Sequence, residues 1–298
     1  MNLHRVDLVS LSLFSLVARC GSISKGAELA ALAIGAASKR LTDLEQSLGT
    51  RLLDRHSRGV TLTPAGVALQ RHAQRILSDV DQMTADLSDY ASGLTGVVRL
   101  WANTSAVTQF LPGQVSSFVG ANPGIRIELE EADSQDIVLA VLDGRADLGI
   151  FADRTPANGL QVQPYRQDRL VLVVPPRHPL ARRRQVRFEE AMAFDFVTLA
   201  RATSLARRLQ AETEALGRTL RARTQVRSFD AICKMVAVGM GVAVLPDVAA
   251  EPLARSLGLR CVVLADAWAA RWLLLGVREG ASLSRHVRSF VEHLAPAA

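Results

Sequence analysis

The sequence lacks a long apolar run, a secretion signal and any close pair of cysteines, and each absence excludes a class of protein. No stretch of the 298 residues approaches about 18 consecutive apolar residues, so we expect no membrane partner. Residues 1–13 contain no apolar segment that ends in a small-residue cleavage site, which argues against secretion. The odd cysteine count and wide spacing exclude a disulfide framework and a CxxC centre and favour a cytoplasmic location: Cys20, Cys233 and Cys261.

The sequence also lacks the motifs of common enzyme classes. It contains no Gly-x-Ser-x-Gly elbow, no His-Glu-x-x-His and no phosphate loop, and Gly239-Met240-Gly241 lacks the third glycine of a dinucleotide loop. We therefore expect no enzyme, no cofactor and no metal. A small-molecule enzyme and a pure solute-binding protein remain open as alternatives, and either would keep its activity if residues 1–66 were deleted.

The composition permits a large core, and the positive charge is concentrated at one end. Apolar residues make up 49% of the chain and charged residues 21%, which excludes wholesale disorder. Residues 1–75 hold ten basic and five acidic side chains, whereas the remaining residues hold 25 and 24. A small basic module joined to a near-neutral body is typical of a nucleic-acid-binding protein with a second function.

Three short helices are expected at the N-terminus. Asp7 precedes apolar residues at helical spacing over residues 8–18, and Gly21 ends this first helix. Ser24 is the expected N-cap of a second helix over residues 25–31. A break near residues 33–35 leads into a third helix over 36–48, which Gly49 ends. Two short helices joined by a tight turn behind a leading helix predict a helix-turn-helix, with a plain helical bundle as the alternative.

A basic hairpin and a long helix follow. The extended runs 51–53 and 59–62 predict a hairpin with Arg55 and Arg58 at its tip, suited to lie along phosphates. Thr63 and Pro64 then open a helix as its N-cap and first residue. Its apolar positions alternate spacings of four and three, which predicts a coiled-coil dimer, although packing on its own domain is the alternative: Leu69, Ala73, Ile76, Val80, Met83 and Leu87.

The body alternates strand-like and helix-like segments in two similar sets, which predicts an α/β fold with two lobes. Asn103-Thr104-Ser105 follows the first strand of one set, and Ala202-Thr203-Ser204 follows the first strand of the other. Helix N-termini that carry hydroxyls suit a small anion, and α/β folds bind ligands at the carboxyl ends of strands. Simple N-capping is the alternative for each pair.

Residues 21–66 resemble the DNA-binding domain of the LysR-type transcriptional regulators. The segment is GSISKGAELAALAIGAASKRLTDLEQSLGTRLLDRHSRGVTLTPAG, and the matching positions are Leu44-Glu45, Leu48-Gly49, Arg51-Leu52, Arg55, Arg58, Leu62-Thr63 and Ala65-Gly66. The body is more loosely similar to the effector-binding domain of that family and, through it, to type 2 periplasmic binding proteins. Its matching segments are Leu111-Pro112, Asn122-Pro123, 144–150, 178–181 and 239–246.

The resemblance implies a sequence-specific transcriptional regulator built in three parts. A winged helix-turn-helix covers residues 1–62, a linker and dimerisation helix covers 63–92, and a two-lobed effector-binding domain covers 93–298. Lobe I comprises about 93–164 and 268–298, and lobe II about 165–267. The implied partners are double-stranded DNA, a small-molecule effector that we expect to be an organic anion, further copies of the chain in a homodimer or homotetramer, and RNA polymerase.

Candidate contact residues follow from this organisation and from side-chain chemistry. Where the family has Ser-Gln-Ser or Ser-Pro-Ser, this chain has Ala33-Ile34-Gly35, so the usual base contacts cannot be transferred there. Glu45 is expected to be structural and to point away from DNA. The candidates for DNA contact are Ser24, Lys25, Gly35, Ala36, Ser38, Lys39, Arg40, Arg55, Arg58 and Thr63. The candidates for effector contact are Asn103, Thr104, Ser105, Phe151, Thr203 and Ser204.

Overall fold

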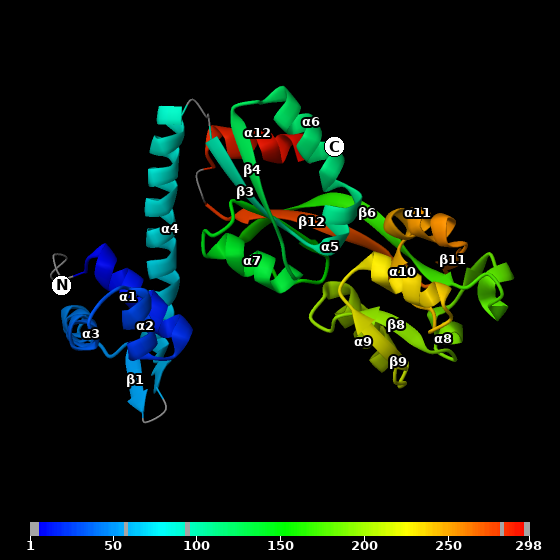
Figure 1. Cartoon of the computed structure of the whole chain (residues 1–298), viewed down its shortest axis with the longest axis horizontal. Coiled ribbons are helices and arrows are strands. Elements are labelled where there is room, and N and C mark those ends of the chain that lie inside the picture. The colour runs from blue at the N-terminus through cyan, green and yellow to red at the C-terminus, as the bar shows by residue number, and fades with distance from the viewer. Residues whose placement is uncertain (1–5, 57–58, 93–95, 281–282, 295–298) are drawn as a thin grey trace. The chain divides into compact units, whose positions relative to one another are not determined.

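The computed structural model describes residues 6–56, 59–92, 96–280 and 283–294. Beyond residue 80 of the long helix, the one side chain described is that of Met83. Internal contacts divide the chain near residue 95 into two compact units, each described separately below (Figure 1). Among the described residues, none of the helices combines the length and apolarity needed to cross a membrane.

The first unit is a winged helix-turn-helix followed by a long helix. Its elements are α1 (Leu8–Cys20), α2 (Ile23–Leu29), α3 (Ile34–Leu48), the hairpin strands β1 (Leu53–His56) and β2 (Gly59–Leu62), and α4 (Pro64–Ser92). The core gathers Phe14, Val17, Leu41 and Leu44 with both hairpin strands. Helices α1 and α2 pack so closely that a Cβ at Gly26 would lie 2.3 Å from Cγ2 of Val17, which explains the glycine.

Three element boundaries differ from the sequence expectation. Ser22, not Ser24, caps α2, because its side chain accepts from the Lys25 N–H and leaves Ser24 inside the helix. Helix α3 begins at Ile34 and has no side-chain cap at Ala33. The first helix-like segment of the body, which the sequence pattern places at residues 105–120, is two helices, α5 (Thr104–Gln109) and α6 (Leu111–Ala121), because a proline in the first turn of α6 starts a new helix.

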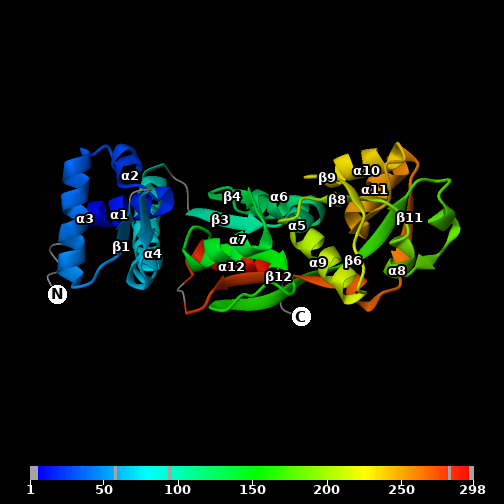
Figure 2. The ribbon, with the colours of Figure 1, turned by 90° about the horizontal axis from the view of Figure 1, so that it is seen from below.

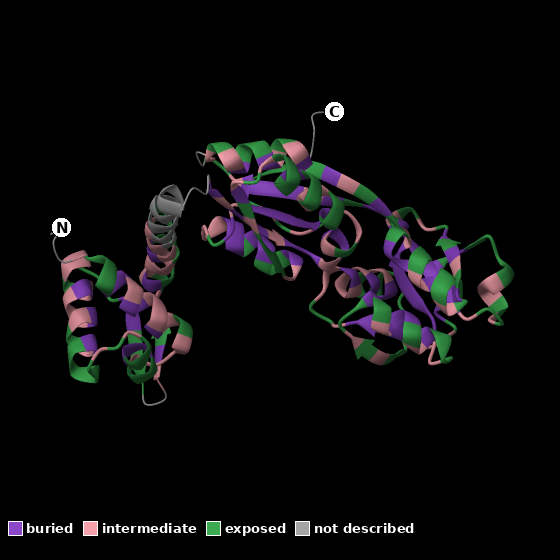
Figure 3. Cartoon of the chain, turned by 45° about the horizontal axis from the view of Figure 1, so that its top comes forward, coloured by how far each residue is buried: buried purple, intermediate pink, exposed green. Residues whose placement is uncertain are grey.

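The first lobe of the second unit is a sheet covered by helices on both faces. Strands β3 (Gly96–Ala102), β4 (Ile125–Glu131) and β5 (Leu148–Ala152) are parallel, and β12 (Ala270–Arg278) pairs antiparallel with β5. Helices α5, α6 and α12 (Arg285–Leu294) cover the face with Leu148 and Ile150. Helix α7 (Ser134–Leu142) covers the face with Phe151. Figure 3 shows the buried residues concentrated in these strands.

The second lobe has its own core. Strand β6 (Leu160–Val174) pairs there with β10 (Ala243–Pro246) and β11 (Arg260–Leu264), and β7 (Gln185–Val186) extends the sheet. Strands β8 (Phe196–Leu199) and β9 (Ala222–Val226) form a parallel pair. The surrounding helices are α8 (Phe188–Ala191), α9 (Ser204–Ala215), α10 (Phe229–Ala237) and α11 (Asp247–Leu257), with 3-10 turns at Pro179–Arg182 and Ala267–Ala269.

Strands β6 and β12 cross between the lobes side by side (Figures 1 and 2). Tyr165 belongs to the core of the first lobe, whereas residues 170–174 belong to the core of the second. The antiparallel ladder runs from Ala270 opposite Arg169 to Arg278 opposite Leu160, with a register shift between Leu273 and Leu274. Any movement of one lobe against the other therefore bends these two strands.

Candidate functional site

The exposed residues of α2 and α3 include several of the predicted DNA contacts. Ser24, Lys25, Gly35, Ala36 and Lys39 are exposed. A Cβ at Gly35 would meet no atom within 4 Å, so the backbone is open to a partner there. The first turn of α3 also has no side-chain cap, which leaves its N–H groups available.

Other predicted DNA contacts are engaged within the first unit. Arg40 Nη1 donates to Asp7 Oδ2 at 2.8 Å, which ties α3 to the start of α1. Arg55 donates from Nη1 to Ser38 Oγ at 3.1 Å and from Nη2 to Thr42 Oγ1 at 3.2 Å, so it joins the wing to α3. These contacts hold the two arginines on the protein surface in this structure.

Thr63 and Glu45 have structural roles. Thr63 Oγ1 accepts from the Gly66 N–H at 3.0 Å, which caps α4 as expected. The expectation that Glu45 is structural is confirmed, because Oε1 accepts from the N–H groups of Leu52 and Leu53 at 2.8 and 3.1 Å. Arg58 lies outside the described residues.

The apolar stripe of α4 has two different parts. Ala73 is fully buried, and Leu69 is half-buried against the winged-helix core. The first turns of the stripe therefore pack on α1 of the same chain, and the dimerisation role of the stripe stays a prediction. Ile76 and Met83 are 40% and 55% exposed, whereas the side chain of Leu87 is outside the description.

The residues predicted to bind an effector meet in the second unit, with one exception. Asn103, Thr104, Ser105, Thr203 and Ser204 line one cavity of about 10 Å³, which has room for about one water molecule. Phe151 does not join them. It is fully buried against α7, because successive residues of β5 face opposite sides of the sheet.

Capping accounts for part of this cluster. Asn103 Oδ1 accepts from the Ala106 N–H at 3.0 Å, and Thr203 Oγ1 accepts from the Ala206 N–H at 3.2 Å. Thr104 donates to Glu131 Oε1 at 2.6 Å. The N-capping alternative is therefore confirmed for Asn103 and Thr203, while Ser204 faces the larger cavity next to this one.

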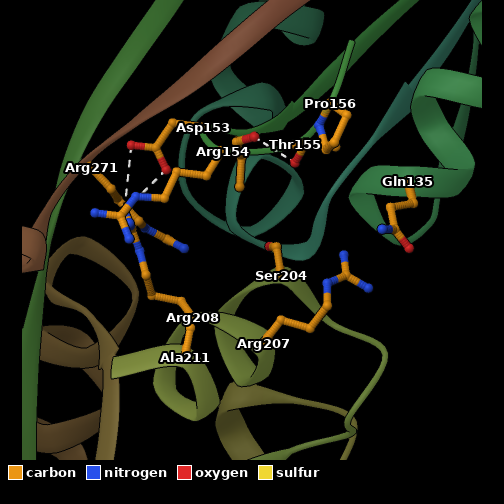
Figure 4. Close-up of a pocket in the computed structure, with 11 residues that line it drawn as sticks. Gln135, Asp153, Arg154, Thr155, Pro156, Ser204, Arg207, Arg208, Ala211 and Arg271 are labelled. Atoms are coloured by element: carbon orange, nitrogen blue, oxygen red, sulfur yellow. Dashed lines mark hydrogen bonds and ion pairs between the residues drawn. The ribbon is translucent and has the colours of Figure 1, made fainter. Parts of the chain in front are cut away.

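The larger cavity, of about 260 Å³, is lined by arginines that the sequence interpretation missed (Figure 4). Ser204, Arg207, Arg208 and Ala211 line it from one face of α9, because residues spaced by three, four and seven share a helix face. That spacing after Ser204 was the available signal. The other lining residues are Gln135, Ala152, Asp153, Arg154, Thr155, Pro156 and Arg271.

A buried ion pair lies at the back of the cavity. Arg271 on β12 donates from Nε to Asp168 Oδ1 at 2.5 Å and from Nη2 to Asp168 Oδ2 at 2.6 Å. The same Nη2 donates to Ser105 Oγ at 2.7 Å, and Gln109 Nε2 donates to Asp168 at 3.3 Å. The side chains of Arg271 and Asp168 are 2% and 0% exposed. The network therefore joins both crossing strands to α5.

The remaining arginines differ in how their charge is balanced. Arg208 Nη2 donates to Asp153 Oδ1 at 3.1 Å. Burial lowers the pKa of the Arg208 guanidinium, an effect that Asp153 opposes. Arg154 pairs with Glu212 at 3.0 Å and is 63% exposed. Among the described residues Arg207 forms no ion pair within 4 Å, so the cavity carries unbalanced positive charge suited to an anion.

One acid lies near that unbalanced charge. Burial raises the pKa of the Asp133 carboxyl, and the positive charge of Arg207 acts in the opposite direction. Asp133 belongs to the small cavity of about 10 Å³. The acid is therefore beside the large cavity and does not line it.

A DNA-binding winged helix-turn-helix and a two-lobed domain with an anion-suited cleft together define a ligand-responsive DNA-binding protein. Residues 8–67 match the model of the bacterial regulatory helix-turn-helix protein, lysR family, and residues 91–298 match the LysR substrate binding domain. The chain therefore belongs to the LysR family of transcriptional regulators, as the sequence resemblance predicted, and the fold class is confirmed.

Relatives and solved structures agree with this assignment. A probable RuBisCO transcriptional regulator of Chlorokybus atmophyticus is 30% identical over 67% of this chain and 64% of its own length, just under two thirds. One from Cyanidioschyzon merolae is 28% identical over 79% of this chain and 80% of its own length.

Two solved structures show the same fold at low identity. Full-length CbnR complexed with target DNA has a TM-score of 0.65 at 19% identity, covering 97% of this chain and 98% of that chain. The Synechocystis PCC6803 CcmR regulatory domain in complex with 2-PG has a TM-score of 0.62 at 23% identity, covering 67% and 95%.

Proposed function

We propose that this chain is a sequence-specific DNA-binding regulator of transcription whose operator binding responds to a small organic anion in the cleft between the lobes. The observation that carries the proposal is the cavity of about 260 Å³ lined by four arginines, of which Arg207 forms no ion pair among the described residues. The solved complex of CcmR with 2-PG supports a small-molecule role for the equivalent domain.

The DNA-binding half of the proposal rests on α3. Gly35 and Ala36 permit close approach of the backbone, and Lys39 supplies a donor to bases or phosphates. Ser24 and Lys25 lie at the start of the helix-turn-helix, where they contact the phosphate backbone. Arg40 and Arg55 position α3 and the wing, and they reach DNA only if their internal contacts are exchanged for phosphates.

The effector couples to DNA through the arrangement of subunits. An anion held between α9 and the crossing strands favours one closed arrangement of the two lobes. That arrangement biases the spacing between the winged helices of the subunits. The coupling cannot exceed the preference of the effector for one closure over the other. We further propose that the chain acts as a homodimer or homotetramer through α4, contacts RNA polymerase at the promoter and works in the cytoplasm.

DNA binding is tested by fluorescence anisotropy of labelled duplexes with the full chain at several salt concentrations. We expect affinity to fall steeply with salt, because phosphate contacts release counterions. Lys39→Gln should weaken binding and reduce the salt slope by about one. Lys234→Gln is the matched control, because Lys234 is an exposed lysine in the second unit, paired with Asp230. Failure to bind any duplex at low salt would refute the proposal that the chain is a DNA-binding regulator.

Effector binding is tested by thermal unfolding of the same preparation with a panel of small organic anions. We expect at least one anion to raise the unfolding temperature of the wild-type chain, because a ligand that binds the folded state stabilises it. Arg207→Gln should reduce this shift, since it removes the unbalanced charge. A shift of equal size in the variant would show that the anion binds elsewhere.

A further inference from the structure

Two guanidiniums in the cleft each have a terminal nitrogen that donates to none of the described residues. The Arg208 side chain is 9% exposed, and its Nη1 is buried with no acceptor in the described part of the chain, while Nη2 donates to Asp153. The Arg271 side chain is 2% exposed, and its Nε and Nη2 are occupied by Asp168 and Ser105. Its Nη1 donates to none of the described residues. Both side chains line the same cavity.

The positively charged guanidiniums of Arg208 and Arg271 also repel each other. Burial is the largest cause of the lowered pKa of Arg208, and the charge of Arg271 lowers that pKa further. Two buried cations with unused donors form a site at which an added anion satisfies hydrogen bonds and relieves repulsion together.

We propose that a carboxylate group of the effector binds between Nη1 of Arg208 and Nη1 of Arg271. This inference rests on the proposed function and specifies how its cleft recognises a ligand. A carboxylate fits because each of its two oxygens accepts one of the two unused donors, and charge-assisted hydrogen bonds are among the strongest. Asp153 and Asp168 act as positioning residues that hold each guanidinium with Nη1 left free.

The volume of the cavity and its other lining residues indicate the size of the effector and the groups it carries besides the carboxylate. The cavity of about 260 Å³ admits only a compact molecule. The uncharged polar side chains that line it are those of Ser204, Thr155 and Gln135, which suit uncharged polar substituents. Arg207, on the same face of α9, can receive a second anionic group. The effector class is therefore a small carboxylic acid that carries further hydroxyl, carbonyl or acidic groups.

The position of the pair also explains how binding is sensed. Arg208 lies on α9 in the second lobe, whereas Arg271 lies on the crossing strand β12 and pairs with Asp168 on the other crossing strand, β6. A carboxylate that bridges the two arginines links α9 directly to both crossing strands. A bound carboxylate therefore restrains the two crossing strands at the point where movement of the lobes bends them.

The test is isothermal titration of the full-length chain with acetate, succinate and inorganic phosphate. We expect a carboxylate to bind the wild-type chain and Arg208→Gln to weaken that binding about 10- to 100-fold, the range for a charge-assisted hydrogen bond. Arg208→Lys keeps the charge and should recover part of the loss. Arg218→Gln is the matched control, because Arg218 is an exposed arginine paired with Glu189, and it should bind as the wild type does.

Each contrary result has a separate meaning. If carboxylates bind wild type and Arg208→Gln equally, the inference is overturned, whereas an organic-anion effector elsewhere in the cleft survives. If phosphate shows the dependence on Arg208 and the carboxylates do not bind, the carboxylate assignment is overturned. If no probe binds the wild type, the inference fails, and duplex binding by the same preparation decides separately whether the chain is a DNA-binding regulator. Tryptophan fluorescence verifies that each variant is folded, because Trp101, Trp268 and Trp272 all lie in the second unit.

Discussion

Removing the carboxylate of Asp168 should destabilise the second unit more than any loss of a surface charge. The Asp168 side chain is fully buried and accepts from two nitrogens of Arg271 and from Gln109. Asp168→Ala removes the carboxylate that pairs with the guanidinium of Arg271. That guanidinium is left buried with Ser105 as its one described hydrogen-bond partner.

The expected magnitude follows from the burial of the pair. Breaking a buried ion pair by removing one partner typically costs about 3–5 kcal/mol. For a unit of roughly 200 residues each kcal/mol lowers the unfolding temperature by about 2–4 °C, so the shift should be about 6–20 °C. Asp230→Ala serves as the control. It breaks the exposed pair with Lys234, and exposed pairs contribute about 0–1 kcal/mol.

The assay is urea and thermal unfolding of the full-length chain followed by tryptophan fluorescence. All three tryptophans lie in the second unit, so the signal does not report on the winged helix. A double variant, Asp168→Ala with Arg271→Met, should recover much of the lost stability, because it removes the uncompensated charge. If Asp168→Ala loses no more stability than Asp230→Ala, or if the double variant recovers nothing, the buried-charge reasoning is refuted.

Three further outcomes are expected. Glu45→Ala leaves the N–H groups of Leu52 and Leu53 without acceptors and should cost the winged helix about 1–3 kcal/mol, measured by circular dichroism; an unchanged melting curve would contradict the role. Met83→Glu places a charge on the exposed stripe of α4 and should shift the chain toward monomer in light scattering; an unaltered mass would remove α4 from the interface. Burial raises the pKa of the Cys233 thiol to about 11, so at pH 8 about one thiol in a thousand is ionised and iodoacetamide should leave it intact until the protein unfolds, as mass spectrometry will show.

The local elements of the fold were predictable because their signals are short-range. The N-cap at Asp7, the αL glycines Gly21 and Gly49, and the Thr63-Pro64 start of α4 each act within a few residues of the chain. The predicted N-cap of α2 was wrong because two nearby residues carry the same capping signal. Ser22 and Ser24 both have cap chemistry, and the backbone geometry of the turn selected Ser22.

The apolar stripe of α4 shows a different limit. A spacing of 3.5 residues predicts that one helix face is buried but does not identify what covers it. Only the packing of the first unit shows that Ala73 is buried, on a helix that packs on α1, whereas Met83 remains exposed. The sequence therefore predicts the stripe, and tertiary contacts divide it between intramolecular packing and a surface open to a partner.

By itself, the sequence determined the family, the order of the two units and the two hydroxyl-bearing helix starts, because these depend on motifs and periodicity along the chain. Only the tertiary structure decided which charges meet in the cleft. Arg271 and Asp168 are 103 positions apart, and Arg208 and Asp153 are 55 apart, so no local pattern joins them. They meet because the chain crosses twice between the lobes, and their burial there makes each lone charge costly and the unused nitrogens available to a ligand.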